Sequence, residues 1–341
     1  MRAAFRLKSI VATLGLLGAT VAGTAYAQNI KIAMVIPTTG PLTQYGDMVK
    51  EGVSTAVEQI NAAGGINGKQ IEVTTVDDAC EPKQGPVAAN RVVNSKIGYM
   101  IGPVCSGAAI AAAPIYDNEG VVVVTPSATS PALTEGKNFH YIFRTIGRDD
   151  QQGPSAAKFI IEKAKPSKVA VLHDKQSYGQ GIAASVRSEL QKANVNVALF
   201  EGINAGDSDY SAIITKLKSA GVDFVYYGGY HPEMGLLLRQ AAEQGVKAKF
   251  MGPEGVGNPD INAIAGPAAE GRHVVIVRIS LVRQTEDILN AFEAEVLKHP
   301  EVRGCYLMTG EEDYLLRLEL EHAGDYERIH KEILSRLPGV T

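Results

Sequence analysis

The sequence lacks the short motifs by which many enzymes are recognised. It contains no Walker A sequence, no Gly-x-Gly-x-x-Gly and no Cys-x-x-Cys. Its histidines, among them His140, His173 and His231, are scattered without metal-ligand spacing. Cys105 and Ser106 are the nearest candidate nucleophiles, but the sequence offers no general base for either of them. We therefore predict a protein that is not an enzyme and that carries neither a metal nor a cofactor.

The sequence also lacks a strong excess of one charge and a long apolar segment. A net charge of -4 over 341 residues gives no reason to expect nucleic acid or an anionic membrane as a partner. The apolar run over residues 10–21 is too short to favour a membrane span. It follows a basic start and precedes Ala25-Tyr26-Ala27, which is the order of an export signal. We predict that residues 1–27 are a signal peptide and that the mature chain is periplasmic.

Cysteine is scarce, and three residues are an odd number for an exported chain. We predict that Cys80 and Cys105 form a disulfide, which leaves Cys305 over. In an oxidising compartment, closing that loop would stabilise the fold by roughly 3 kcal/mol through chain entropy.

Short apolar runs of strand character alternate with longer segments of helical period from Ile30 onward, as in a parallel sheet covered on both faces. The first series predicts strands over 30–36, 70–77, 99–102 and 121–125, with helices over 45–63, 82–96 and 107–118. After a short run at 141–144, a second series predicts strands over 168–173, 195–201, 222–228 and 249–252, with helices over 151–163, 178–193, 210–220 and 232–244. We therefore predict an α/β fold of two doubly wound lobes, with ligand bound outside the carboxyl ends of the strands.

The last seventy residues differ in composition and in element order. Residues 1–271 hold 7 arginines and 17 lysines, whereas residues 272–341 hold 7 arginines and 2 lysines, and charged residues rise from 48 of 271 to 22 of 70. The tail predicts strands over 273–282, 302–307 and 314–320, with helices over 286–299 and 325–337. This βαββα order is that of a ferredoxin-like α+β fold without its last strand. We predict a signal peptide followed by units over 28–145, 146–271 and 272–341.

Six stretches at the predicted strand ends resemble the ligand-binding loops of the periplasmic branched-chain amino acid binding proteins of ABC importers. They are Gly40 to Gly46, Cys105-Ser106-Gly107, Thr125 to Thr129, His173 to Gly179, Tyr226 to Tyr230 and Gly252 to Asn258. The resemblance is continuous over roughly 240 residues, from 28 to 271. It implies a two-lobed type I binding-protein fold and a membrane permease as the partner.

The resemblance also implies how the ligand is held. Ser106, Ser127, Ala128 and Thr129 would grip the α-carboxylate of leucine, isoleucine or valine, using hydroxyls, backbone N–H groups and a helix N-terminus. Glu254 would pair with the α-ammonium, assisted by Tyr230. Tyr45 and Tyr178 would pack against the aliphatic side chain of the ligand.

The chain departs from that family after Gly271, where members continue for about another hundred residues that complete the first lobe. The segment that replaces them resembles the effector-binding domain of the leucine-responsive, asparagine-type transcription regulators. The strings that carry this second resemblance are Val302 to Gly310, Asp313 to Leu316 and Leu334 to Val340. The second resemblance implies a homodimer formed through residues 272–341, with an effector loop at 309–313.

These two resemblances allow three hypotheses. The first is an exported receptor that binds a branched-chain amino acid between its lobes without chemical turnover. The second is an amino-acid-sensing or dimerising fusion. The third is a chimera without intact transport activity, because the missing residues would leave apolar faces of the first lobe exposed, at a cost that marginal stability hardly absorbs.

Overall fold

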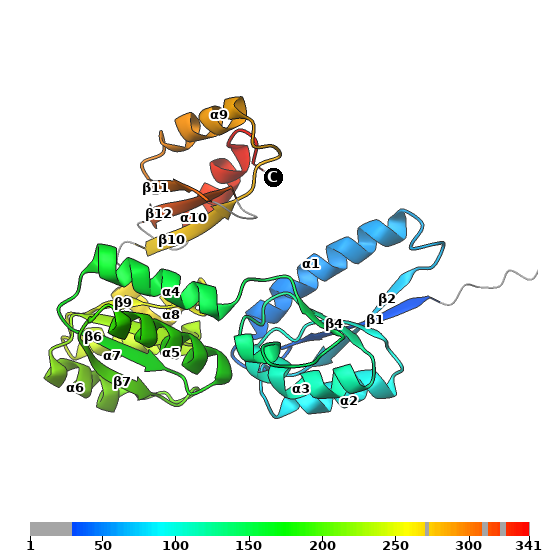
Figure 1. The fold of residues 1–341 in the computed structure, drawn as a ribbon, viewed down its shortest axis with the longest axis horizontal. Helices are drawn as coiled ribbons and strands as arrows, with labels where there is room; N and C mark the ends of the chain where they lie inside the picture. The colour runs from blue at the N-terminus through cyan, green and yellow to red at the C-terminus, as the bar shows by residue number, and fades with distance from the viewer. Residues whose placement is uncertain (1–28, 270–272, 309–312, 321–324, 341) are drawn as a thin grey trace, which may run out of the picture.

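A computed structural model describes residues 29–269, 273–308, 313–320 and 325–340 of the chain. The predicted signal peptide, the change of family at Gly271 and most of the predicted effector loop lie outside these residues. Figure 1 shows two α/β lobes side by side and a smaller unit that contains the C-terminus. The element order confirms the predicted α/β lobes and the βαββα tail.

The first lobe is built on a five-stranded parallel sheet in the order β2-β1-β3-β4-β5. Its strands are β1 (Ile30–Ile36), β2 (Ile71–Asp77), β3 (Tyr99–Ile101), β4 (Val122–Thr125) and β5 (Ile142–Arg144). Inward and outward residues alternate along β4, in which Val123 and Thr125 are buried. The carboxyl ends of these strands meet at one edge, which is where ligands of doubly wound sheets bind.

Three helices cover this sheet unequally. They are α1 (Thr43–Ala62), α2 (Gln84–Asn94) and α3 (Ser106–Asn118). Helices α2 and α3 pack together on one face through small residues, since a Cβ on Gly85 would lie 2.5 Å from the carbonyl oxygen of Ala108. Helix α1 packs on the other face beside β1 and β2. Tyr99 of β3 and Phe143 of β5 therefore stay 57% and 51% exposed.

The second lobe has a four-stranded parallel sheet in the order β7-β6-β8-β9. Its strands are β6 (Val169–His173), β7 (Val197–Gly202), β8 (Phe224–Gly228) and β9 (Lys249–Met251). Its α-helices are α4 (Asp149–Phe159), α5 (Ser177–Lys192), α6 (Ser211–Ala220), α7 (His231–Glu243) and α8 (Asp260–Ala265). Helices α4 and α5 cover one face of the sheet, and α6 and α7 cover the other, so that β6 and β8 are buried throughout.

The C-terminal unit has a core of its own. It consists of β10 (His273–Ile279), α9 (Glu286–Val296), β11 (Val302–Leu307), β12 (Tyr314–Leu320) and α10 (Asp325–Glu332). The strands form an antiparallel sheet in the order β10-β12-β11. Phe292 and Tyr314 are buried against each other, with ring centroids 4.6 Å apart. Strand β10 thus pairs with β12 of its own unit rather than with the sheet of either lobe.

The predicted disulfide is confirmed, because Cys80 and Cys105 are joined in the first lobe with their Cα atoms 5.3 Å apart. Cys305 is free and half-buried, and burial raises the pKa of its thiol to about 11, with Glu293 adding to the rise. Within the described part of the chain, no helix combines the length and apolar character needed to cross a membrane.

Candidate ligand-binding site

The start of helix α3 and the loop after β4 bring the predicted carboxylate-binding residues together. The hydroxyl of Ser106 accepts a hydrogen bond from the backbone N–H of Ser130 at 3.2 Å, which leaves its own proton available. The disulfide to Cys80 holds Cys105, which directly precedes Ser106. Because α3 begins at Ser106, its first backbone N–H groups have no partner within the helix and point toward the strand ends.

The structure commits two of the predicted donors to internal bonds. The hydroxyl of Ser127 donates to the carbonyl of Val104 at 2.8 Å. The N–H of Ala128 donates to the hydroxyl of Thr125 at 3.0 Å. The hydroxyl of Thr129 is buried and lies beside the carboxyl group of Asp149, whose pKa it lowers, although no hydrogen bond of regular geometry joins the two. Ser106 and the helix N-terminus are therefore the groups with unused donors, whereas the hydroxyl of Thr129 faces Asp149.

The predicted tyrosines come from both lobes and lie together. Tyr45 lies at the start of α1, Tyr178 in the first turn of α5 and Tyr230 directly before α7. The ring of Tyr230 lies 6.0 Å from that of Tyr45 and 5.2 Å from that of Tyr178, measured between centroids. The three predicted tyrosines are thus neighbours although they come from three helices and two lobes.

Glu254 lies beside this group on the loop after β9. Its side chain is exposed, whereas the next residue, Gly255, is buried. The backbone N–H of Gly255 donates to the hydroxyl of Tyr178 at 3.2 Å. Burial raises the pKa of both Tyr45 and Tyr178, and in each case the carboxylate of Glu254 is the next largest cause. The acidic side chain is therefore close to both rings.

Asp149 is a site residue that the sequence interpretation missed. It begins α4, its side chain is 2% exposed, and neither carboxyl oxygen has a hydrogen bond of regular geometry to the described chain. Burial raises the pKa of Asp149 to about 7; nearby Glu254 adds to the rise, whereas Thr129 and Arg144 oppose it. An Asp at the start of a helix is usually a solvent-exposed cap. The one signal in the sequence for burial of Asp149 was its position directly after the segment that crosses between the lobes.

The crossover between the lobes is anchored to the same loop. The guanidinium of Arg144 donates to the carbonyls of Ala128 and Ser130 at 3.0 and 3.1 Å and to the hydroxyl of Thr134 at 2.9 Å. The N–H of Asp149 donates to the carbonyl of Thr129 at 3.1 Å. The chain therefore leaves the first lobe and enters the second while bonded to the loop that carries the predicted residues Ala128 and Thr129.

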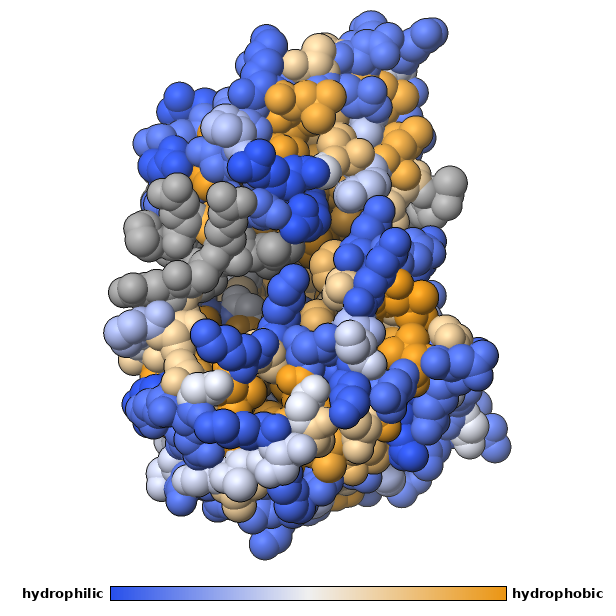
Figure 2. All heavy atoms as spheres, turned by 90° about the vertical axis from the view of Figure 1, so that its left-hand side faces the viewer, coloured by the Kyte–Doolittle hydropathy of each residue, from blue (hydrophilic) through white to orange (hydrophobic). Residues whose placement is uncertain are grey.

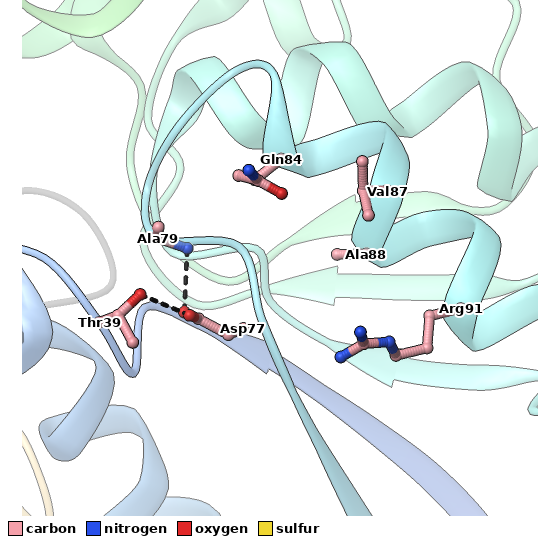
Figure 3. A pocket seen from close by; sticks show the side chains of 7 residues that line it. All are labelled: Thr39, Asp77, Ala79, Gln84, Val87, Ala88 and Arg91. Carbon is pink, nitrogen blue, oxygen red and sulfur yellow. Dashed lines mark hydrogen bonds between the residues drawn. The ribbon is translucent and has the colours of Figure 1, made fainter.

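A separate hollow of about 260 Å³ lies near the ends of β1 and β2 (Figure 3). In it, Asp77 accepts hydrogen bonds from the N–H groups of Thr38 and Ala79 and from the hydroxyl of Thr39. These three donors hold the pKa of Asp77 below its usual value against a raising effect of burial. None of the predicted ligand-contacting residues lines this hollow, which we therefore do not assign to the site.

Two family matches divide the chain. Residues 29–300 match the family described as periplasmic binding protein, and residues 274–341 match the Lrp/AsnC ligand binding domain. The two matches overlap over residues 274–300, which contain β10 and α9. In the structure these elements pack with β12 in the C-terminal unit.

Curated relatives match over most of the two lobes. A leucine-, isoleucine-, valine-, threonine- and alanine-binding protein of Pseudomonas aeruginosa is 53% identical over 270 residues, which are 79% of this chain and 72% of that protein. A leucine-specific-binding protein of Salmonella typhimurium is 46% identical over 293 residues, 86% of this chain and 78% of that protein.

Solved structures share the same fold. A leucine binding protein from Thermotoga maritima superposes with a TM-score of 0.68 at 27% identity, over 79% of this chain and 76% of that one. A branched-chain amino acid transporter substrate binding protein from Streptococcus pneumoniae, in complex with isoleucine, gives a TM-score of 0.65 at 32% identity, over 78% and 75%. These likenesses confirm the predicted two-lobed type I binding-protein fold.

Proposed function

Because the chain belongs to the periplasmic binding protein family, we propose that it is the substrate-binding component of an ABC-type importer for branched-chain amino acids. The ligand would lie between the two lobes and would leave chemically unchanged. The proposal rests on one observation above others, the proximity of hydroxyl and backbone donors at Ser106 and Thr129 to the carboxyl groups of Asp149 and Glu254. Such a site matches both charges of a zwitterionic amino acid.

The carboxylate of the ligand fits the first-lobe side of the site. Ser106 offers a hydroxyl proton, the start of α3 offers backbone N–H groups with a favourable dipole, and Thr129 would have to turn its hydroxyl from Asp149 toward the ligand to donate as well. Charged acceptors strengthen such hydrogen bonds. We propose that Ser127 and Ala128 shape this loop through their internal bonds rather than by donating to the ligand.

The ammonium of the ligand fits Asp149 and Glu254. A buried carboxylate without hydrogen bonds is costly, and a cation placed against it removes much of that cost. Tyr226 is a buried tyrosine of β8. Burial raises its pKa, and the carboxylates of Glu254 and Asp149 raise it further. Its hydroxyl, which has no hydrogen-bond partner in the described chain, therefore lies near these two carboxylates. We propose Asp149 as an ammonium partner in addition to the predicted Glu254.

The aliphatic side chain of the ligand would lie against the rings of Tyr45, Tyr178 and Tyr230. Their centroid separations of 5.2 to 6.0 Å describe a compact aromatic wall. Apolar surface buried there contributes roughly 25 cal/mol per Å². We propose leucine, isoleucine and valine as ligands, in keeping with the relatives that bind them.

The proposed setting is the periplasm, with a membrane permease as the partner that receives the ligand. An extracytoplasmic location agrees with the family and with the disulfide between Cys80 and Cys105. The described relatives are binding proteins, which supports a role without catalysis. The proposed units are residues 28–145, 146–271 and 272–341.

Isothermal titration calorimetry of the purified mature chain with leucine, isoleucine and valine tests this function. We expect saturable binding of at least one of them and none of an acidic amino acid, because Asp149 and Glu254 would repel a second carboxylate. Absence of heat at millimolar concentrations of all three ligands would rule out the proposed specificity.

A second function is supported by the C-terminal unit. The sheet face opposite its helices exposes Ile276 of β10 to 51% and Tyr306 of β11 to 46%. Figure 2, which views the side that carries the second lobe and this unit, shows hydrophobic patches between hydrophilic side chains. We propose that this face pairs two chains into a homodimer, as the match to the Lrp/AsnC domain suggests.

Sedimentation velocity distinguishes a dimer from a monomer. We expect a dimer that Ile276→Asp dissociates, whereas Val87→Asp, at an exposed apolar site in the first lobe, leaves it intact. Sedimentation of the unmodified chain as a monomer at all concentrations would contradict this second function.

A further inference from the structure

The first two residues after the start of α1 reach across to the second lobe. The hydroxyl of Tyr45 donates to the carbonyl oxygen of Gly255 at 2.8 Å. The side-chain amide of Gln44 donates to the carboxylate of Asp260 at the start of α8. Both contacts join the two lobes directly, without a ligand between them.

A histidine completes the grip on the Tyr45 hydroxyl. The Nδ1 atom of His231, in the first turn of α7, lies 3.2 Å from the Tyr45 oxygen. Because the Tyr45 proton is directed at Gly255, the hydrogen bond requires the tautomer in which His231 Nδ1 carries the proton and donates it. His231 is buried, so its ring is held in place by the second lobe.

The peptide at Gly255 is therefore held from both sides. Its N–H donates to Tyr178, which belongs to the second lobe, and its carbonyl accepts from Tyr45 of the first. A Cβ at Gly255 would come within 2.9 Å of the carbonyl oxygen of Gly229 and of the Tyr178 ring. Only glycine fits this position, and the residue before it is Glu254.

Tyr45 is itself rigidly placed. Gly46, the next residue, lies so close to the loop after β1 that a Cβ would stand 2.2 Å from the carbonyl oxygen of Pro37. The ring of Tyr45 also packs with Tyr230 and His231, at centroid distances of 6.0 and 5.7 Å. Because the Tyr45 hydroxyl is fixed to the first lobe, its bond to Gly255 also fixes the position of the second lobe relative to the first.

We propose that Tyr45, assisted by Gln44, is an interlobe latch: a positioning residue that holds the lobes together and places Glu254 through its bond to Gly255. Loss of the latch opens the cleft and shortens the lifetime of the ligand complex. The kinetic part of this proposal rests on the proposed function, whereas the part that concerns lobe closure does not.

Pulsed dipolar spectroscopy measures lobe closure directly. Spin labels are placed at Lys50→Cys in the first lobe and Lys247→Cys in the second, both exposed, in a Cys305→Ser background that leaves the Cys80–Cys105 disulfide in place. We expect Tyr45→Phe, which removes only the hydroxyl, to move the distance distribution toward longer values. Gln44→Ala is expected to shift it in the same direction.

Stopped-flow release of leucine gives the kinetic readout. We expect Tyr45→Phe to speed release about 3- to 10-fold, the range for loss of one hydrogen bond, with little change in the association rate. Tyr99→Phe, which removes an exposed hydroxyl elsewhere in the first lobe, is the matched control and should change neither measurement.

Two results overturn the latch: a Tyr45→Phe distance distribution equal to that of the unmodified chain, or an equal shift caused by Tyr99→Phe. Failure of the proposed function is recognised separately, because an unmodified chain that binds no leucine still reports its lobe distance. A distance shift without leucine binding would support the latch and reject the ligand.

Discussion

Asp149 and Glu254 are carboxylates of one site in two different surroundings. Glu254 is exposed, while Asp149 is buried beside the hydroxyl of Thr129 and has no side-chain hydrogen bond of regular geometry within the described chain. Desolvation disfavours the charged form of Asp149, and a nearby like charge does the same. Their sequence positions predicted only Glu254, through resemblance, because burial of Asp149 depends on how α4 packs after the crossover.

Ligand affinity should depend on pH through Asp149. Its pKa is about 7 without a cation beside it, and the ligand ammonium would lower that pKa by favouring the charged form. Binding then releases a proton, so affinity rises as pH increases through 7 and levels off above it. We expect the Kd for leucine to be about tenfold weaker at pH 6 than at pH 8, measured by calorimetry.

The matched variants isolate this effect. Asp149→Asn should weaken binding at pH 8 and remove most of the pH dependence. Asp78→Asn changes another buried carboxyl, whose pKa burial raises to about 6, but one that lies outside the site; it should leave the dependence in place. If Asp149→Asn retained the full tenfold change, another group would have to be responsible.

The bounds of the helices and strands show which elements can be predicted from the periodicity of apolar residues alone. Strands β1, β11 and β12 have the predicted bounds, and in β1 and β12 alternating or continuous apolar residues define them directly. Helix α8 was not predicted: it is six residues long, too short to show a helical period. The contact that it provides, Asp260 with Gln44, joins residues 216 positions apart and has no local signature.

The disulfide stabilises the element that begins the ligand site. It closes a loop of 25 residues between Cys80 and the start of α3, which corresponds to roughly 3 kcal/mol. We expect the Cys80→Ala, Cys105→Ala double variant to lose about that much in urea unfolding and to bind leucine more weakly. Cys305→Ser serves as the control; unchanged stability of the double variant would show that packing alone fixes α3.

The two lobes differ in how completely their sheets are covered. Parallel sheets are normally buried on both faces, as in the second lobe. In the first lobe the face shared by Tyr99 and Phe143 remains exposed beyond α1. The chain spans 72% and 78% of the two relatives described above. The exposed apolar residues of this face, Tyr99 and Phe143, are the observation that supports the hypothesis of a chimera without intact transport activity.

A comparison of melting curves tests that hypothesis. Replacement of residues 272–341 by the C-terminal third of a complete relative should cover the exposed face and raise the Tm of the first lobe. Burial of two large side chains contributes about 2 kcal/mol each, or about 4 kcal/mol together, which corresponds to a rise of roughly 10 to 20 °C. Equal Tm and equal cooperativity in the two chains would refute the hypothesis.

Arg144 ties the interlobe crossover to the carbonyls of Ala128 and Ser130, and Asp149 is tied to Thr129. A rotation of the lobes would therefore move the loop that carries the proposed ligand contacts. We expect occupancy of the proposed site to be coupled to the angle between the lobes. A fluorophore attached at exposed Lys137→Cys would leave the pair of Glu135 with Arg148 of the crossover in place and would report a change of the angle between the lobes as a change of fluorescence.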